Sequence, residues 1–181
     1  LGCLSVAAVP QEAVTSVSAT TPVAPDPGST PPPAPCTAEE HRQFDFWIGE
    51  WDVFGPDGSV AGTNTIESIL AGCVLTETWT GAAGGTGRSL NMFYKSDGKW
   101  HQNWVDGRGG RLDIAGKLVD GKMTMWGEMP ARDGGWVMHK ITWHPLEGGD
   151  VRQHWQASRD GGTTWKDLFN GTYKRKVAAQ Q

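Results

Sequence analysis

The first 40 residues of this 181-residue chain contain no lysine, arginine, histidine or aromatic residue, although they hold eight of its 11 prolines. A segment without large apolar side chains cannot offset the entropy cost of ordering its backbone. We therefore interpret residues 1–36 as an export-signal remnant followed by a disordered linker rich in Pro, Ala, Ser and Thr. Residues 37–177 are the predicted folded domain, and residues 178–181 are a short tail.

The sequence also lacks the features of several functional classes. No apolar run approaches the roughly 18 residues that a membrane-spanning helix requires. The net charge is −4, yet residues 41–181 carry equal numbers of acidic and basic residues and no basic stripe, so we expect no nucleic-acid partner. The glycine-rich run 81–87 precedes a predicted strand rather than a helix, which argues against a phosphate-binding loop.

Cysteine is scarce, and the three cysteines bear on the cellular compartment of the protein. The first three residues resemble the end of a bacterial lipobox, which predicts a lipidated Cys3 and a membrane tether, whereas small residues at 6–8 fit an ordinary signal-peptide cleavage region. Both alternatives place the domain in the periplasm or outside the cell. In such an oxidising compartment we expect a disulfide between Cys36 and Cys73, the alternative being two unrelated buried thiols.

Glycine, in contrast, is abundant, and it divides the domain into short segments. Asp-Gly and Gly-Gly pairs supply the positive φ angles that tight hairpins require. Nine such turns separate ten predicted strands, and they lie at 55–58, 71–72, 81–87, 96–98, 107–110, 120–121, 133–135, 148–149 and 160–162. Several segments alternate apolar and polar residues, as an antiparallel sheet with one interior does.

These patterns predict an all-β domain that consists of a single antiparallel up-and-down β-barrel of about ten strands. Closing the barrel would remove exposed strand edges, and a two-sheet sandwich is the alternative. A short N-terminal helix is expected near 37–42, with Thr37 as its N-cap.

Strand parity assigns a mixed set of side chains to the barrel interior. Buried polar groups without partners cost about 1–3 kcal/mol each, so these groups pair with one another or with water, or they line a cavity. We favour a cavity for a small aromatic or amphipathic molecule, because ten strands enclose more space than side chains easily fill. The predicted ligand-binding residues are Trp47, Trp79, Asn91, Gln102, Trp104, Gln153, Trp155 and Phe169.

Glu77 is the ionisable residue of most interest in this predicted interior. A carboxyl group beside Trp79 in dry surroundings should have a raised pKa, which suits general acid/base chemistry. His139 shares the parity of Ile141 and could exchange a proton with Glu77. An enzyme of the lyase, isomerase or hydrolase type, with Glu77 and His139 as catalytic residues, is therefore the main alternative to a binding protein. A barrel with a filled core, in a structural envelope protein, is a third hypothesis.

We expect neither a metal nor a cofactor. Met123 and Met125 share one strand face and could suggest a soft copper site. Methionine at such positions more often fills a core, however.

The segment 44–51 contains Gly49-x-Trp51, which resembles the lipocalin and calycin signature. In that superfamily a first-strand tryptophan closes the barrel floor beneath a cationic residue from the last strand. The resemblance implies a cation–π contact between Trp51 and Arg175. From Cys36 to Arg175, including the run 100–106, the chain also looks like a family of bacterial secreted proteins with a lipocalin-like barrel. That resemblance implies the fold and no reaction.

Residues 158–165 match the Asp-box, a hairpin motif that repeats in sialidase propellers. A propeller needs several blades of about 40 residues each. The motif occurs once here, so we interpret it as a structural hairpin.

Overall fold

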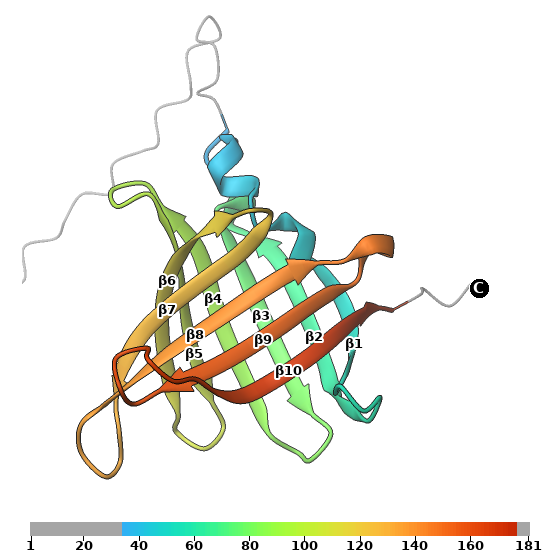
Figure 1. Ribbon diagram of the computed structural model, residues 1–181. Coiled ribbons are helices and arrows are strands. Elements are labelled where there is room, and N and C mark those ends of the chain that lie inside the picture. Colours follow the sequence, from blue (N-terminus) through green and yellow to red (C-terminus); the bar gives the residue numbers. More distant parts are fainter. Residues whose placement is uncertain (1–33, 177–181) are drawn as a thin grey trace, which may run out of the picture. The chain divides into compact units, whose positions relative to one another are not determined.

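The computed structural model describes residues 34–176, which form a closed antiparallel barrel (Figure 1). Each strand pairs with the next along the chain, and the first pairs with the last, which confirms the predicted up-and-down barrel over the sandwich. The strands are β1 (Gly49–Phe54), β2 (Val60–Ile69), β3 (Val74–Gly81), β4 (Thr86–Tyr94), β5 (Lys99–Asp106), β6 (Arg111–Val119), β7 (Lys122–Pro130), β8 (Trp136–Pro145), β9 (Val151–Ser158) and β10 (Lys166–Arg175). Each of the nine predicted turns coincides with a connection between consecutive strands, although the turn at 81–87 was predicted too long and overlaps the ends of β3 and β4.

The tight β6–β7 connection shows why these turns contain Asp-Gly and Gly-Gly pairs. Asp120 and Gly121 both have positive φ angles, 49° and 72°. A two-residue hairpin with positive φ at both central positions matches the right-handed twist of its strands, and Asp-Gly adopts it readily. The alternation predicted for β6 is also observed, because Leu112 and Ile114 are buried while Arg111 is exposed.

The segment before β1 contains the short helix expected near residues 37–42, but it differs from the prediction in detail. It forms two short 3₁₀ helices, η1 (Glu39–Arg42) and η2 (Asp45–Trp47), and no side chain caps the start of η1, so the N-cap role predicted for Thr37 is wrong. Two further 3₁₀ turns, η3 (Leu70–Gly72) and η4 (Glu147–Gly149), lie in the β2–β3 and β8–β9 connections. Trp47 therefore belongs to a helical turn and not to the first strand, where strand parity had placed it.

This N-terminal segment closes one end of the barrel with aromatic side chains. The Phe44 ring stacks on Trp47 at 4.9 Å and meets the edges of Trp100 at 5.6 Å and Trp143 at 5.2 Å. The indole nitrogen of Trp100 also donates a hydrogen bond to the carbonyl of Glu40. Hydrophobic burial, rather than strand pairing, therefore holds the segment in place.

The contact implied by the lipocalin resemblance joins the first strand of the barrel to the last. The Arg175 guanidinium lies 4.3 Å from the Trp51 ring centroid and donates a hydrogen bond to the carbonyl of Ile48 at 2.9 Å. A Cβ at Gly49, whose φ is 147°, would lie 2.3 Å from an Arg175 nitrogen. The spacing Gly49-x-Trp51 therefore leaves room for the arginine above the tryptophan.

A disulfide joins Cys36 to Cys73 and so attaches the N-terminal segment to the start of β3, as predicted. The bond is compatible with an oxidising location outside the cytoplasm. Of the predicted leader only residues 34–36 are described. Residue Cys3, its proposed lipidation and the tail at 178–181 lie outside the described residues.

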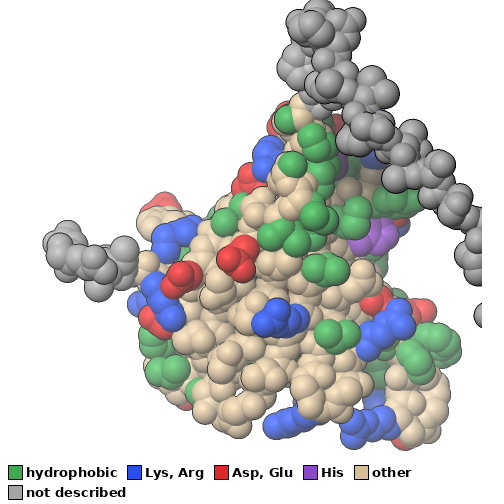
Figure 2. Space-filling view, turned by 180° about the vertical axis from the view of Figure 1, so that it is seen from behind, with side chains coloured by type: hydrophobic (Ala, Val, Ile, Leu, Met, Phe, Trp, Pro, Cys, Tyr) green, Lys and Arg blue, Asp and Glu red, His purple; other side chains and the backbone are tan. Residues whose placement is uncertain are grey.

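The outer surface is mixed in character. Figure 2 shows the side of the molecule opposite to that in Figure 1, where Lys and Arg side chains are scattered among acidic ones and hydrophobic side chains lie in small groups. Exposed apolar residues on β4 and β5 include Leu90, Met92 and Val105. Within residues 34–176, no helix is long and apolar enough to cross a bilayer.

Replacing both Cys36 and Cys73 by alanine is expected to lower the free energy of unfolding by about 3–4 kcal/mol, because the bond closes a long loop in the unfolded chain. Urea unfolding without reductant measures the loss. Adding reductant should destabilise the wild type and leave the double variant unchanged. An equal response of both proteins to reductant would contradict the prediction.

Candidate functional site

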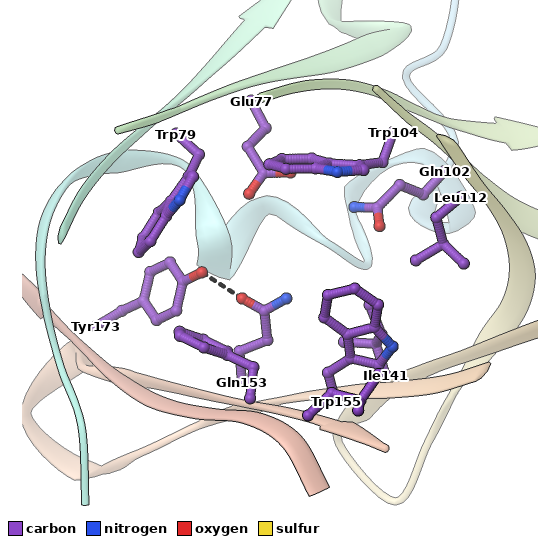
Figure 3. Close-up of a pocket in the computed structure, with 11 residues that line it drawn as sticks. Glu77, Trp79, Gln102, Trp104, Leu112, Ile141, Gln153, Trp155 and Tyr173 are labelled. Carbon is purple, nitrogen blue, oxygen red and sulfur yellow. Dashed lines mark hydrogen bonds between the residues drawn. The ribbon is translucent and has the colours of Figure 1, made fainter. Parts of the chain in front are cut away.

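A cavity of about 190 Å³ lies inside the barrel, and Figure 3 shows side chains from opposite walls projecting into it. Three partly exposed tryptophans, Trp79, Trp104 and Trp155, lie on its walls, whereas Glu77 and Gln102 are buried. The cavity therefore passes from the tryptophans inward to Glu77. Its lining residues are Glu77 and Trp79 on β3, Gln102 and Trp104 on β5, Leu112 on β6, Ile141 on β8, Gln153 and Trp155 on β9, and Leu168, Phe169 and Tyr173 on β10.

The structure brings most of the predicted ligand-binding residues together. Trp79, Gln102, Trp104, Gln153, Trp155 and Phe169 all line the cavity, as does Glu77. The other two predicted residues do not. Trp47 packs against Phe44 at the closed end of the barrel, and Asn91, on β4 between β3 and β5, is fully buried but does not line the cavity.

The aromatic walls depend on glycines in the same strand or in a neighbouring one. A Cβ at Gly87 would lie 2.1 Å from the Trp104 ring, and one at Gly171 would lie 2.5 Å from the Phe169 ring. A Cβ at Gly62 would similarly meet Trp79 at 2.9 Å. Each ring therefore lies flat against the wall over a residue without a side chain, which leaves the lumen open.

Gly87→Ala is expected to displace the Trp104 ring and to destabilise the barrel by about 1–3 kcal/mol, since overpacking forces side chains from their preferred positions. The near-ultraviolet circular dichroism of the tryptophans should change with it. Gly85→Ala is the matched control in the same hairpin, because nothing lies within 4 Å of its Cβ position. If the two variants had the same stability and the same spectrum, the ring would not depend on Gly87.

A chain of hydrogen-bond donors ends on the carboxyl group of Glu77. Asn64 donates to its Oε1 at 2.7 Å, and the Ser89 hydroxyl donates to its Oε2 at 2.7 Å. The side-chain nitrogen of Asn91 donates to the Ser89 hydroxyl oxygen at 2.8 Å. The side-chain nitrogen of Gln102 donates to Oδ1 of Asn91, also at 2.8 Å. The four polar side chains are thus oriented toward a single acceptor and favour its ionised form.

Tyr173 extends this network to the opposite wall. Its hydroxyl donates to the Gln153 carbonyl oxygen and accepts a long hydrogen bond, 3.4 Å, from Asn64. Burial raises the pKa of Tyr173 well above its ordinary value of 10, and the nearby Glu77 raises it further, so the phenol stays neutral. Sequence parity had assigned neither Asn64 nor Ser89 to the site. The available signal was period-two spacing, because Ser89 lies two residues before Asn91, which parity had placed inward, and Asn64 lies two residues before the apolar Ile66.

Burial raises the pKa of Glu77 from 4.5 to about 7, although hydrogen bonds from Ser89 and Asn64 act in the opposite direction. Both protonation states are therefore populated near neutral pH. The group can carry a buried negative charge, donate a hydrogen bond as the acid, or exchange a proton with a bound molecule.

The predicted Glu77–His139 pair is not formed. The carboxyl oxygens of Glu77 are bonded to Asn64 and Ser89, while Nδ1 of His139 accepts a hydrogen bond from the Trp155 indole at 3.0 Å. Burial lowers the pKa of His139, which favours the neutral ring that this bond requires. His139 lies on the predicted side of β8 but does not line the cavity, because strand parity fixes the face and not the height along the barrel.

Two other predicted features have structural roles. Met123 and Met125 are fully buried in the hydrophobic core, and no cluster of three His, Cys, Asp or Glu side chains able to hold a metal occurs within residues 34–176. In the Asp-box, Asp160 accepts hydrogen bonds from the Ser158 hydroxyl and from the amide and hydroxyl of Thr164. The motif therefore shapes the β9–β10 hairpin.

No protein-family model matches the chain, and no curated protein matches it either. The chemistry of the cavity is therefore the basis for a functional proposal. That chemistry combines aromatic walls, one buried carboxyl group and amide groups from opposite walls.

Replacing Glu77 by Gln should change how stability depends on pH. Between about pH 4.5 and 7 the folded wild type holds a proton that the unfolded chain has released, so its free energy of unfolding falls as the pH rises. The shift corresponds to roughly 3 kcal/mol. Urea unfolding at pH 4.5 and 7.5 measures this effect. The free energy of unfolding of Glu77→Gln, taken relative to wild type, should be higher at pH 7.5 than at pH 4.5 by about that amount. Stability differences that were equal at both pH values would contradict the raised pKa.

Proposed function

We propose that the barrel binds a small aromatic or amphipathic molecule in this cavity. The observation that supports the proposal most directly is a space of about 190 Å³ with tryptophan rings on its walls and polar groups at its inner end. An apolar cavity of about 150 Å³ is large enough to bind benzene. The cavity therefore suits one aromatic ring with a short substituent.

The division of the lining fits this role. Ligand pockets are mostly apolar and contain a few polar groups that set orientation. Here the rings supply apolar contact, while Glu77, Gln102 and Gln153 can bind polar groups of the ligand. Hydrogen bonds with Asn64, Ser89 and Asn91 hold Glu77 and Gln102 in place before a ligand arrives, which lowers the entropy cost of binding.

An enzyme is the second candidate, and the observation that favours it is the pKa of Glu77 at about 7. A general acid or base works best with a pKa near the operating pH. With no bond between Glu77 and His139, the carboxyl group would act alone on a bound substrate. In an enzyme Glu77→Gln would reduce turnover of that substrate much more than its affinity.

The proposal includes a location outside the cytoplasm and kinship with lipocalin-like secreted proteins. The Cys36–Cys73 bond supports the location, since structural disulfides persist in oxidising compartments. The contact between Trp51 and Arg175 supports the kinship.

Trp104→Ala should weaken binding of small aromatic compounds at least tenfold, because it removes one wall of the cavity. Burial of a large apolar side chain contributes about 1.5–3 kcal/mol, and losing that contribution to the binding free energy lowers the affinity at least tenfold. Isothermal titration calorimetry with benzyl alcohol, indole and 2-phenylethylamine tests the prediction.

Trp126→Ala is the matched control, because Trp126 lies on β7 with 53% of its surface exposed and does not line the cavity. It should leave every affinity unchanged. Failure of all three compounds to bind the wild type, or equal losses in both variants, would contradict a binding function for the cavity.

A further inference from the structure

We infer that the cavity selects a small organic cation, with the Glu77 carboxylate as its counter-ion. The expected ligand combines one aromatic ring with one charged amine group. The inference rests on the proposed binding function and specifies its ligand class. It is carried by the charges, hydrogen-bond acceptors and aromatic faces that line the cavity.

The charge balance of the cavity is one-sided. Of its lining residues only Glu77 can carry a charge near neutral pH, because Tyr173 stays neutral and no Lys, Arg or His is among the lining residues. An anionic ligand such as a fatty acid would therefore meet a like charge and find no cation to pair with. A cationic ligand would supply the opposite charge that a buried carboxylate needs.

The acceptors that remain also suit an amine. An ionised carboxylate has about four lone-pair sites, and Asn64 and Ser89 use two of them. Gln102 donates through its nitrogen to Asn91, so its carbonyl oxygen is left as an acceptor for the ligand. An ammonium group has donors for both. On the opposite wall, the Gln153 carbonyl is occupied by Tyr173, which leaves its amide nitrogen for a polar substituent elsewhere on the ligand.

The aromatic walls favour a positive charge in a second way. Ring faces carry partial negative charge and attract cations within about 6 Å of the ring centre, tryptophan most strongly. Trp79, Trp104 and Trp155 surround the space into which Glu77 projects (Figure 3). Trp79 is held in place by an edge contact with Phe169 at 6.0 Å. The same rings therefore provide both the apolar contact for an aromatic group and a favourable site for its amine.

Binding of a cation should depend on pH through Glu77. The charged and titratable groups on the adjacent strands point outward, since Glu67 on β2 and Arg88 on β4 are exposed. From across the barrel, Tyr173 is the one titratable group within residues 34–176 that faces the carboxyl group. Below its pKa of about 7 the carboxyl group is protonated in the empty site. Affinity for a permanently charged ligand should then fall about tenfold for each pH unit below that value and stay constant above it.

Three probes of matched shape test the charge preference by isothermal titration calorimetry at pH 7.5. They are 2-phenylethylamine, neutral 2-phenylethanol and anionic phenylacetate. The amine should bind at least tenfold more tightly than the alcohol, and phenylacetate should bind most weakly. Glu77→Gln should reduce the ratio of amine to alcohol affinity to near one. Glu67→Gln removes the same charge from the outer surface of the adjacent strand and should retain the wild-type ratio.

A fourth probe, phenyltrimethylammonium, keeps its charge at every pH and tests the titration in the wild type from pH 5 to 8. A sloping and then level affinity profile supports Glu77 as the counter-ion, whereas a flat profile overturns it. These wild-type measurements remain decisive even if Glu77→Gln fails to fold.

Equal binding of amine and alcohol, with both weakened by Trp104→Ala, would overturn the cation preference and leave the binding function intact. Binding of none of the probes would overturn both. A tighter complex with phenylacetate than with the amine would overturn the sign of the proposed charge selection.

Discussion

Pairing of the first strand with the last is the constraint on which the rest of this structure depends. Trp51 on β1 lies opposite Arg175 on β10, and the arginine covers the indole while it binds the carbonyl of Ile48. Closure removes two strand edges that would otherwise expose unpaired backbone groups. It also creates the lumen, because residues from β3, β5, β6, β8, β9 and β10 line the cavity and meet only when the ring is complete.

Within that lumen the protein keeps a carboxyl group where an apolar side chain would pack at lower cost. Desolvation of Glu77 opposes its charge, while the donors Asn64 and Ser89 favour it. Desolvation outweighs the two donors and raises the pKa to about 7, so the group titrates close to neutral pH. Hydrogen bonds in a low-dielectric interior also hold the side chains of Glu77, Ser89 and Asn91 in fixed orientations.

The open space beside Glu77 has a specific structural origin. Large aromatic residues usually fill interiors, yet Trp79, Trp104 and Phe169 lie against the wall because a glycine is beneath each ring. At the other end of the barrel, Phe44, Trp47 and Trp143 pack against one another and fill the interior. Tryptophan therefore fills the interior at one end of the barrel and lines an open cavity at the other, according to the space that its neighbours leave.

The sequence by itself determined the features that depend on local rules. Gly-containing turns and period-two alternation are properties of a few adjacent residues, so they predicted ten strands, the barrel and the inward faces of Glu77, Gln102 and Trp155. Only the tertiary structure decided which inward side chains meet. Asn64 and Tyr173 are 109 residues apart and touch because the strand register and barrel closure bring them together. His139 faces inward as predicted but lies at a height where it meets Trp155 and not Glu77. The alternation along one strand shows which side chains face inward, but not how far along the barrel axis each one lies. That position depends on the stagger between strands, which is set by the whole closed sheet.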